Sequence, residues 1–339
     1  MKAKQHSPLL AVSTILILFF ISICYGCSSL SGNTPLSSVK NGDKRVAITM
    51  DDLPLNIASS VTNKEMAAIT DKILSHIKEY NVPVVAFVNE DGLIVNDSLD
   101  VERISILNRW LDAGVELGNH TYSHKSLNKT SASEYKDDVV RGEETIRKLL
   151  ANHGLKLRYF RHPYLHTGKD LQTRDEIVRF LEGRGQKVAP VTFDNSEWVF
   201  AKAYDIACAA NNKAQMDEIA KAYIPYMKSK QHFFEKNTDE LFGRRIDHIQ
   251  LIHANRLNSD CLPALLKMMT EDGYSFITLE EALKDSAYLS DDRFIDSCCG
   301  ISWLHRWALT QGKKGNDKFF KGEPLVPAEI LKIAGLEHE

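Results

Sequence analysis

Several features are scarce in this 339-residue sequence, and each scarcity excludes a class of protein. Positive charge is not in excess, because 42 lysines and arginines meet 45 aspartates and glutamates for a net charge of −3. A nucleic-acid-binding domain would instead carry a clearly basic face. Internal repeats and low-complexity stretches are missing, and a hydrophobic content of 43% excludes disorder, collagen and a coiled coil. The length fits two ordinary domains or one α/β barrel.

The N-terminal apolar run is too short to span a bilayer. It covers residues 9–24, which is 16 residues, whereas a span needs about 20. Two lysines precede the run and small residues follow it, so residues 1–26 are predicted to be a secretory signal peptide. The Gly-Cys-Ser sequence around Cys27 resembles a bacterial lipobox, in which this cysteine is lipidated. Residues 27–43 are rich in Ser, Gly and Asn and predict a tether.

We therefore expect an exported protein. It would be a membrane-anchored lipoprotein of a bacterial cell envelope, held through lipid on Cys27, or a secreted or periplasmic protein. An uncleaved N-terminal anchor is a further alternative. The sequence does not indicate an oligomeric state.

Cysteine is scarce as well. Beyond Cys27 the exported chain contains only Cys208, Cys261, Cys298 and Cys299. An oxidising compartment permits disulfides, and four cysteines allow three full pairings. A bridge between the two adjacent residues would be strained, so we expect Cys298 or Cys299 to reach Cys208 or Cys261. Buried free thiols are the alternative.

Short β-branched runs alternate with segments of helical periodicity over residues 44–284. Such alternation predicts parallel strands joined by crossover helices. Seven strands favour a barrel-like α/β domain, closed or not, with an open doubly wound sheet as the alternative. The predicted strands are residues 46–50, 84–88, 115–119, 158–161, 188–193, 248–253 and 276–278, and the predicted helices are residues 64–80, 101–113, 131–153, 171–181 and 258–270.

Two segments interrupt or follow this alternation. Residues 199–247 are rich in Ala and Lys and predict a helical insertion that Pro225 interrupts. Residues 285–339 form a C-terminal extension that contains Trp303, His305 and Trp307. These aromatic residues are predicted to pack a helix onto the core, and stacking on sugar rings is the alternative.

Ionisable and aromatic residues follow most of the predicted strands. In α/β barrels the active site forms at the carboxyl ends of the strands, so these residues are candidates for a common site. They are Asp51 and Asp52 after the first strand, His120 and His124 after the third, Arg161 at the end of the fourth, Asp194, Glu197 and Trp198 after the fifth, and His253 at the end of the sixth.

The pair His120 and His124 has the spacing of metal ligands. Four residues apart, both imidazoles lie on one side of a helical turn, and an aspartate from a neighbouring strand would complete a set that leaves positions for water and substrate. Thr121 stands where a zincin protease has Glu. A second carboxylate beside the metal can act as a general base if Arg161 keeps it ionised. His253 is the candidate acid, and a core histidine is the alternative.

These residues resemble those of the polysaccharide deacetylases with NodB homology, carbohydrate esterase family 4, over residues 44–284. The resemblance implies the fold of this family, a deformed (β/α)7 barrel, and the five motifs of the family occur in order. They are Thr49-Met50-Asp51-Asp52 for T-F-D-D, His120-Thr121-Tyr122-Ser123-His124 for H-[ST]-x-x-H, Arg161-His162-Pro163-Tyr164 for R-x-P-Y, Asp194-Asn195-Ser196-Glu197-Trp198 for D-x-x-D-W, and Leu251-Ile252-His253 for L-x-H. The resemblance does not account for residues 199–247 or 285–339.

The resemblance implies roles for the metal-binding half of the site. Asp52, His120 and His124 would hold one divalent metal ion, which is zinc in most members of the family and cobalt or nickel in others. Asp51 would be the general base, and Arg161 would hold it in place.

The resemblance also implies roles around the acetyl group and the leaving group. The backbone N–H of Tyr164 would help to bind the oxyanion. His253 would be the acid, oriented by the carboxylate of the fourth motif. Glu197 is favoured for that carboxylate, although its extra methylene leaves Asp194 as an alternative. The walls of the acetyl pocket would come from Tyr164, Trp198 and Leu251.

The sequence thus predicts a metal-dependent hydrolase that removes acetyl groups from N-acetylated sugars of an extracellular or cell-wall polysaccharide. The expected partner is an acetylated glycan of unspecified identity, and no nucleic acid is expected. One alternative is hydrolysis of a non-sugar amide by the same site. Another is a catalytically weak, glycan-binding lipoprotein.

Overall fold

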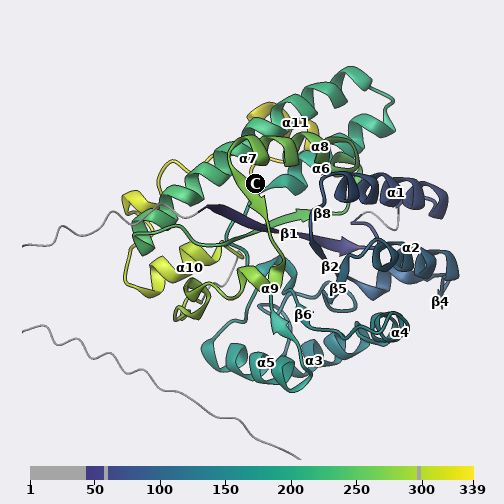
Figure 1. The fold of residues 1–339 in the computed structure, drawn as a ribbon, viewed down its shortest axis with the longest axis horizontal. Helices are drawn as coiled ribbons and strands as arrows, with labels where there is room; N and C mark the ends of the chain where they lie inside the picture. Colours follow the sequence, from purple (N-terminus) through teal and green to yellow (C-terminus); the bar gives the residue numbers. More distant parts are fainter. Residues whose placement is uncertain (1–42, 57–59, 296–298) are drawn as a thin grey trace, which may run out of the picture. The chain divides into compact units, whose positions relative to one another are not determined.

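The computed structural model of the chain describes residues 43–56, 60–295 and 299–339 (Figure 1). The predicted signal peptide, the lipidation residue Cys27 and nearly all of the tether lie outside the described residues. Within the described ranges, no helix combines the length and the apolar character needed to cross a membrane.

Seven strands form one parallel sheet that curls back on itself. Its order is β7-β6-β5-β2-β1-β8, and β9 pairs with the beginning of β1. The chain that follows β7 pairs with β8 through a parallel bridge between Phe193 and Gln250. The fold is therefore a deformed (β/α)7 barrel and not the open doubly wound sheet. The strands are β1 (Lys44–Leu53), β2 (Val84–Val88), β5 (Glu116–Asn119), β6 (Tyr159–Phe160), β7 (Lys187–Val188), β8 (His248–His253) and β9 (Tyr274–Phe276), and a separate hairpin consists of β3 (Ile94–Val95) and β4 (Ser98–Leu99).

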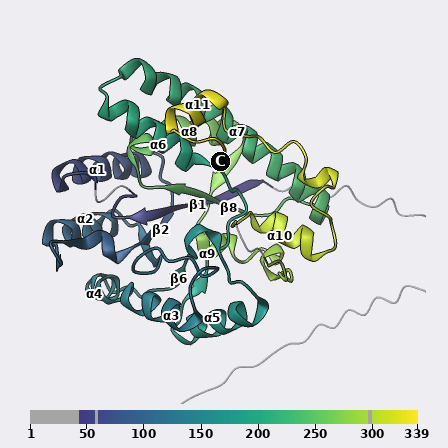
Figure 2. The ribbon, with the colours of Figure 1, turned by 180° about the vertical axis from the view of Figure 1, so that it is seen from behind.

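Helices surround the strands, as Figures 1 and 2 show from opposite sides. Four short 3-10 turns, η2 (Glu90–Leu93), η3 (Pro163–Leu165), η4 (Ser286–Leu289) and η5 (Lys318–Phe320), lie between them. The helices are α1 (Asn63–Glu79), α2 (Val101–Asp112), α3 (Ala132–Arg141), α4 (Glu144–Asn152), α5 (Leu171–Gly183), α6 (Glu197–Ala209), α7 (Lys213–Phe242), α8 (Arg256–Glu271), α9 (Leu279–Ala282), α10 (Trp303–Thr310) and α11 (Ala328–Ala334).

Helix α1 illustrates how the apolar periodicity produces these elements. Ile69, Ile73 and Ile77 recur at helical spacing, and all three are buried against the sheet. The side chain of Thr62 caps the helix by accepting a hydrogen bond from the Glu65 N–H. The period that predicted the helix is therefore the period of its buried face.

The segment predicted as one helix over 131–153 forms two helices. The predicted capping box between Ser131 and Glu134 starts α3, but α3 ends at Arg141 and α4 begins at Glu144. Gly142, between them, lies against the backbone of the loop after β5, where an added Cβ would be 2.5 Å from the carbonyl carbon of Thr121. Contact with this loop therefore requires glycine at the position where the helix breaks.

Two further predictions about element boundaries were wrong. Pro225 does not interrupt the insertion, because α7 continues through it from Lys213 to Phe242, and the break falls before α7, at residues 210–212. Tyr223, Tyr226 and Met227 are buried on both sides of the proline, so tertiary packing outweighs the one lost backbone hydrogen bond. The last strand lies two residues earlier than predicted, at Tyr274–Phe276.

The C-terminal extension packs against the barrel. The Trp303 N–H donates to the Val191 carbonyl, at 2.8 Å. Trp303, His305 and Trp307 are all buried, and the His305 ring lies 5.3 Å from that of Phe234 in α7. These aromatic residues therefore contribute to the core, as predicted.

Two of the cysteines agree with the alternative prediction, which was free thiols and not disulfides. Cys208 and Cys261 are free thiols in the described part of the chain, and Cys261 is buried. The expected bridge to one of these two residues is therefore not formed. Cys298 lies outside the described residues.

Gly300 gives a test of how closely the extension packs against the barrel. A Cβ at this position would lie 1.8 Å from the Tyr164 carbonyl oxygen and 2.6 Å from the Leu165 Cβ. Gly300→Ala is expected to lower the free energy of unfolding by about 1–3 kcal/mol, the usual cost of overpacking, as measured by denaturant unfolding. Gly315→Ala, where nothing lies within 4 Å of the added atom, is the control, and equal unfolding midpoints for the two variants would contradict the contact.

Candidate active site

The register of the parallel strands brings the predicted site residues to one edge of the sheet. Asp51 of β1 is the register partner of His253 of β8. The His120 N–H donates to the Val88 carbonyl at the end of β2, at 3.0 Å. The Arg161 N–H donates in turn to the Asn119 carbonyl at the end of β5, also at 3.0 Å. Four strands thus end side by side, and their following residues face a common site.

The backbone at this edge adopts conformations that residues other than glycine rarely adopt. The φ angles are 66° at Asp52, 67° at Thr121, 53° at His124 and 57° at Tyr164. Left-handed backbone of this kind costs about 1–3 kcal/mol per residue unless the surroundings enforce it. Its concentration in the last residues of β1 and in the loops after β5 and β6 indicates that these segments hold side chains in set positions.

Asp52, His120 and His124 form a group suited to a metal ion. One ligand atom from each lies within 4.8 Å of the other two, and the Asp52 Oδ1 atom is 3.5 Å from the Nε2 atoms of both histidines. The His120 Nδ1 atom lies 2.8 Å from the Arg161 carbonyl oxygen. A carbonyl can only accept, so Nδ1 carries the hydrogen and Nε2 presents its lone pair to the group.

The ionisation of this group also fits a metal ion. Burial lowers the pKa of His120 to about 4, which keeps the ring in the neutral form that binds metals. Burial would raise the pKa of Asp52, but the nearby histidines outweigh it and lower the pKa. The Asp52 Oδ1 atom is buried and has no hydrogen-bond partner among the described residues. A divalent ion would satisfy that oxygen, so the residues present fit the group that the sequence implied.

Asp51 lies beside the three candidate ligands and is buried. Its Oδ2 atom is 3.7 Å from the His120 Nε2 atom and 3.8 Å from the Arg161 Nη1 atom. Arg161 is fully buried, and its Nη2 donates to the Thr49 hydroxyl at 2.8 Å. This hydrogen bond fixes the guanidinium beside the Asp51 carboxyl group.

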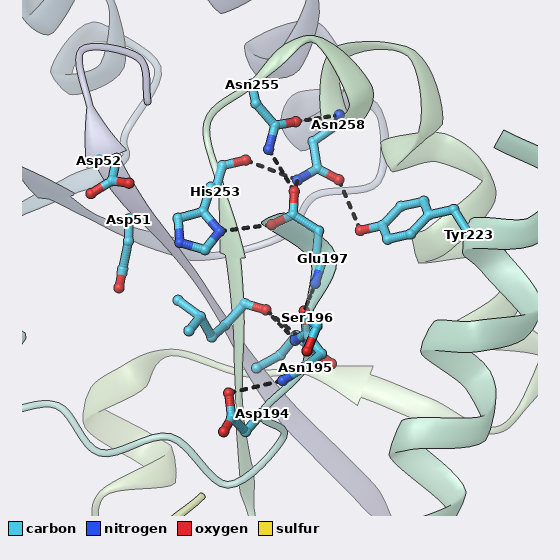
Figure 3. A network of polar contacts seen from close by, with 12 residues as sticks. Asp51, Asp52, Asp194, Asn195, Ser196, Glu197, Tyr223, His253, Asn255 and Asn258 are labelled. Carbon is cyan, nitrogen blue, oxygen red and sulfur yellow. Dashed lines mark hydrogen bonds and ion pairs between the residues drawn. The ribbon is translucent and has the colours of Figure 1, made fainter. Parts of the chain in front are cut away.

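His253 is paired with Glu197, and Asp194 lies elsewhere (Figure 3). The His253 Nδ1 atom is 2.7 Å from the Glu197 Oε2 atom. Burial alone would lower the pKa of His253, but the Glu197 carboxylate, assisted by Asp52 and Asp51, raises it to about 9. Asp194 is at the other end of the same loop, where its carboxylate accepts the Asn195 N–H and burial raises its pKa to about 6. Of the two carboxylates that the sequence left open, Glu197 contacts the histidine.

The residues predicted to line the acetyl pocket differ in exposure. The Tyr164 side chain is 56% exposed, and its ring lies 4.4 Å from the His124 ring, centroid to centroid. Trp198 is 41% exposed, whereas Leu251 is buried in β8. Trp198 lines a hollow of about 480 Å³, whereas Tyr164 lines another one together with His124.

A second hollow lies directly beside the candidate metal ligands. It measures about 490 Å³, and Asp52 and His124 form part of its lining. Asn89 and Asp91 add hydrogen-bonding groups to it, and Asn56 lines both this hollow and that of Trp198. A volume of this size lies within the usual range for small-molecule sites, about 300–1,000 Å³.

Sequence reasoning missed three residues of the site. Asn255 and Asn258 donate to the Glu197 Oε1 atom at 2.5 and 2.7 Å, and Tyr223 donates to the Asn258 Oδ1 atom at 3.0 Å. The one available signal is Asn255, two residues after the predicted strand, since asparagine is a favoured helix N-cap and Asn255 caps α8. Nothing in the sequence pattern links Tyr223 to this position.

Comparisons with known proteins agree with the sequence motifs. The sequence model for polysaccharide deacetylases matches residues 38–178. A bifunctional xylanase/deacetylase of Pseudobutyrivibrio xylanivorans is 23% identical over 163 residues, which cover 48% of this chain and 23% of the relative. A peptidoglycan-N-acetylglucosamine deacetylase of Bacillus cereus is 30% identical over 120 residues, which cover 35% of this chain and 36% of the relative. The chain thus spans well under half the length of these curated relatives.

A solved structure with a similar chain path is a CE4 family pseudoenzyme from Bacillus anthracis. It is 18% identical and has a TM-score of 0.47. The match covers 72% of this chain and 66% of that chain.

Purified protein is expected to bind about one divalent ion per chain, as for a mononuclear site. Loss of a direct ligand in His120→Ala should weaken the affinity by more than the about 10–100-fold that an outer-shell partner is worth. Metal titration after chelation would measure this, with His232→Ala, an exposed histidine paired with Asp272, as the control. Undiminished binding in a His120→Ala, His124→Ala double variant would rule out the site.

Proposed function

Because residues 38–178 carry the sequence pattern of the polysaccharide deacetylases, we propose that this chain is a metal-dependent N-deacetylase. It removes acetyl groups from N-acetylated sugars of an extracellular or cell-wall polysaccharide. The observation that carries the proposal is the pairing of Asp51 with His253 across β1 and β8. This register sets a carboxylate and a histidine beside the same three candidate ligands, as hydrolysis of an amide requires.

Each group has one chemical task. Asp52, His120 and His124 would hold a divalent ion, which would supply Lewis acidity and lower the pKa of bound water; zinc is the first candidate, and cobalt and nickel are the others. Asp51, which lies beside Arg161, accepts a proton from the attacking water. The backbone N–H of Tyr164 faces the developing oxyanion.

The last task is protonation of the leaving amine. An amine leaves poorly unless it gains a proton as the C–N bond breaks, so an acid must stand near the nitrogen. His253, held in the imidazolium form by Glu197, supplies that proton. Glu197 itself is buried and contacts the imidazole, not the substrate.

The expected substrate and location follow from the site and from the N-terminus. The hollow beside Asp52 accepts a sugar unit, and Asn89 and Asp91 offer hydrogen bonds to hydroxyl groups. The predicted signal peptide and Cys27 support export and attachment to a membrane surface. The substrate is therefore proposed to be an acetylated glycan outside the cytoplasm.

Acetate and free amine released from a panel of acetylated substrates would test the proposal. The panel contains peptidoglycan, chitin oligomers, O-acetylated xylan and a non-sugar N-acetyl compound. Release from the N-acetylated glycans is expected. Release from the non-sugar amide alone would indicate a different amidase, and binding without release would indicate a glycan-binding protein.

Asp51→Asn is expected to retain the metal ion and to lower kcat by about 10²–10⁴-fold, the usual worth of general base catalysis. The reason is that the amide cannot accept the proton of the water. Asp71→Asn, on the surface of α1 in an ion pair with Arg109, serves as the control. If Asp51→Asn releases the metal ion instead, Asp51 is a ligand and not the base.

The pH dependence of the rate tests the role of Glu197. The raised pKa of His253 keeps the imidazolium present below that pKa, so the rate falls as the pH rises through it. Glu197→Gln removes the charge that raises the pKa of His253 and leaves burial, which lowers it. The basic limb of the pH–rate profile, where the rate falls with rising pH, should therefore move to lower pH, and the rate should fall. A bound divalent ion lowers the same pKa, so metal-loaded proteins are compared.

Asp194→Asn is the matched control for Glu197→Gln, because Asp194 belongs to the same loop but contacts Asn195 and not His253. Its basic limb should match that of the wild type. A shifted limb in Asp194→Asn together with an unchanged one in Glu197→Gln would overturn the assignment.

A further inference from the structure

The Glu197 carboxylate is enclosed by three hydrogen-bonding side chains, one from the end of β8 and two from the start of α8. Its side chain is 0% exposed. The Oε2 atom accepts from His253 of β8, and the Oε1 atom accepts from Asn255 and Asn258 at the start of α8. A buried carboxylate needs such donors, since an unpaired buried charge is costly. The donors also select one rotamer of a side chain that is a methylene longer than Asp.

The amide of Asn258 acts in only one orientation. Its Nδ2 atom donates to the Glu197 Oε1 atom at 2.7 Å and to the His253 carbonyl at 2.8 Å. If the amide turned over, its oxygen would face both of these acceptors and repel them. A donor on the Oδ1 side would stabilise the same orientation from the other end of the amide.

Tyr223 of α7 is that donor. Its hydroxyl donates to the Asn258 Oδ1 atom at 3.0 Å (Figure 3). Tyr223 is fully buried, and burial raises its pKa well above the usual value, so the hydroxyl keeps its proton. One turn further along α7, the Tyr226 hydroxyl accepts the Ser196 N–H at the start of α6, at 2.8 Å.

We propose that Tyr223 is a positioning residue for proton delivery, in which its hydroxyl sets the Asn258 amide, the amide holds the Glu197 carboxylate, and the carboxylate orients the His253 imidazole. The proposal rests on the proposed deacetylase function. It gives the helical insertion a role, because α7 supports the acid half of the site. The electrostatic setting of His253 comes from Glu197 of α6 and from Asp51 and Asp52 of β1.

The experiment compares wild type, Tyr223→Phe and Tyr204→Phe as full-length, metal-loaded proteins. Phenylalanine keeps the ring contact of Tyr223 with Phe200 and removes only the hydroxyl. Tyr204, a buried tyrosine of α6 whose hydroxyl donates to Asp260, is the matched control away from Glu197. Two substrates are used: an N-acetylglucosamine oligomer, whose amine must be protonated to leave, and 4-nitrophenyl acetate, whose phenolate leaves without a proton.

Tyr223→Phe is expected to lower kcat for the oligomer about tenfold, the rate equivalent of one buried hydrogen bond. KM for the oligomer and the rate with 4-nitrophenyl acetate should not change, and Tyr204→Phe should match the wild type with both substrates. An equal loss with both substrates, or no difference between the two variants, would overturn the proposal. Asn258→Ser, which removes the amide itself, should reproduce the selective loss if Tyr223→Phe does not fold.

A readout without turnover separates this proposal from the proposed function. The hydrogen on the His253 Nδ1 atom, bonded to a buried carboxylate, should give a far-downfield proton NMR signal, identified by its loss in His253→Gln. Tyr223→Phe should shift or broaden that signal, and Tyr204→Phe should not. If no acetate is released from any glycan, the proposed function fails; if the signal is the same in Tyr223→Phe and wild type, the positioning role fails.

Discussion

The parallel register of β1 with its neighbours is the constraint on which the site depends. β1 pairs with β2 on one side and with β8 on the other, so it is central to the sheet and its end is surrounded. Because the side chains of a strand alternate between faces, a shift of one residue against β8 would turn His253 away from Asp51. The site is therefore a consequence of strand pairing. The register aligns the strand ends, and the loops after the strands determine the final positions of the side chains.

Burial determines how those loops are built. Asp51, Arg161 and Glu197 are almost completely removed from water, and each such charge is stable only with partners. Glu197 has all of its partners within the chain. Asp51 and Asp52 each keep a buried oxygen without a hydrogen-bond partner among the described residues. The unsatisfied Asp52 Oδ1 atom is the one nearest the Nε2 atoms of His120 and His124, so hydrogen-bonding capacity is left over among the candidate metal ligands but not around Glu197.

Local sequence signals predicted the elements but not the contacts that cross between them. Period and capping residues located the strands and most helices, since burial of one face produces both the pattern and the element. The break at Gly142 depends on the loop of Thr121, which is distant in sequence. The continuity of α7 through Pro225 depends on the packing of Tyr223 and Tyr226. Such effects are tertiary, so the local sequence contains no sign of them.

The same limit applied to the site. Residues at strand ends were found because the barrel geometry gathers them at one edge. The choice between Asp194 and Glu197 required the path of a loop whose position is fixed by a helix and by the extension. Tyr226 holds Ser196, while the Ser302 hydroxyl and the Trp303 N–H hold the carbonyls of Thr192 and Val191. Both ends of the stretch that carries Asp194 and Glu197 are thus attached to the helical insertion or to the C-terminal extension. These attachments, together with Asn255 and Asn258, determine where the Glu197 carboxylate lies.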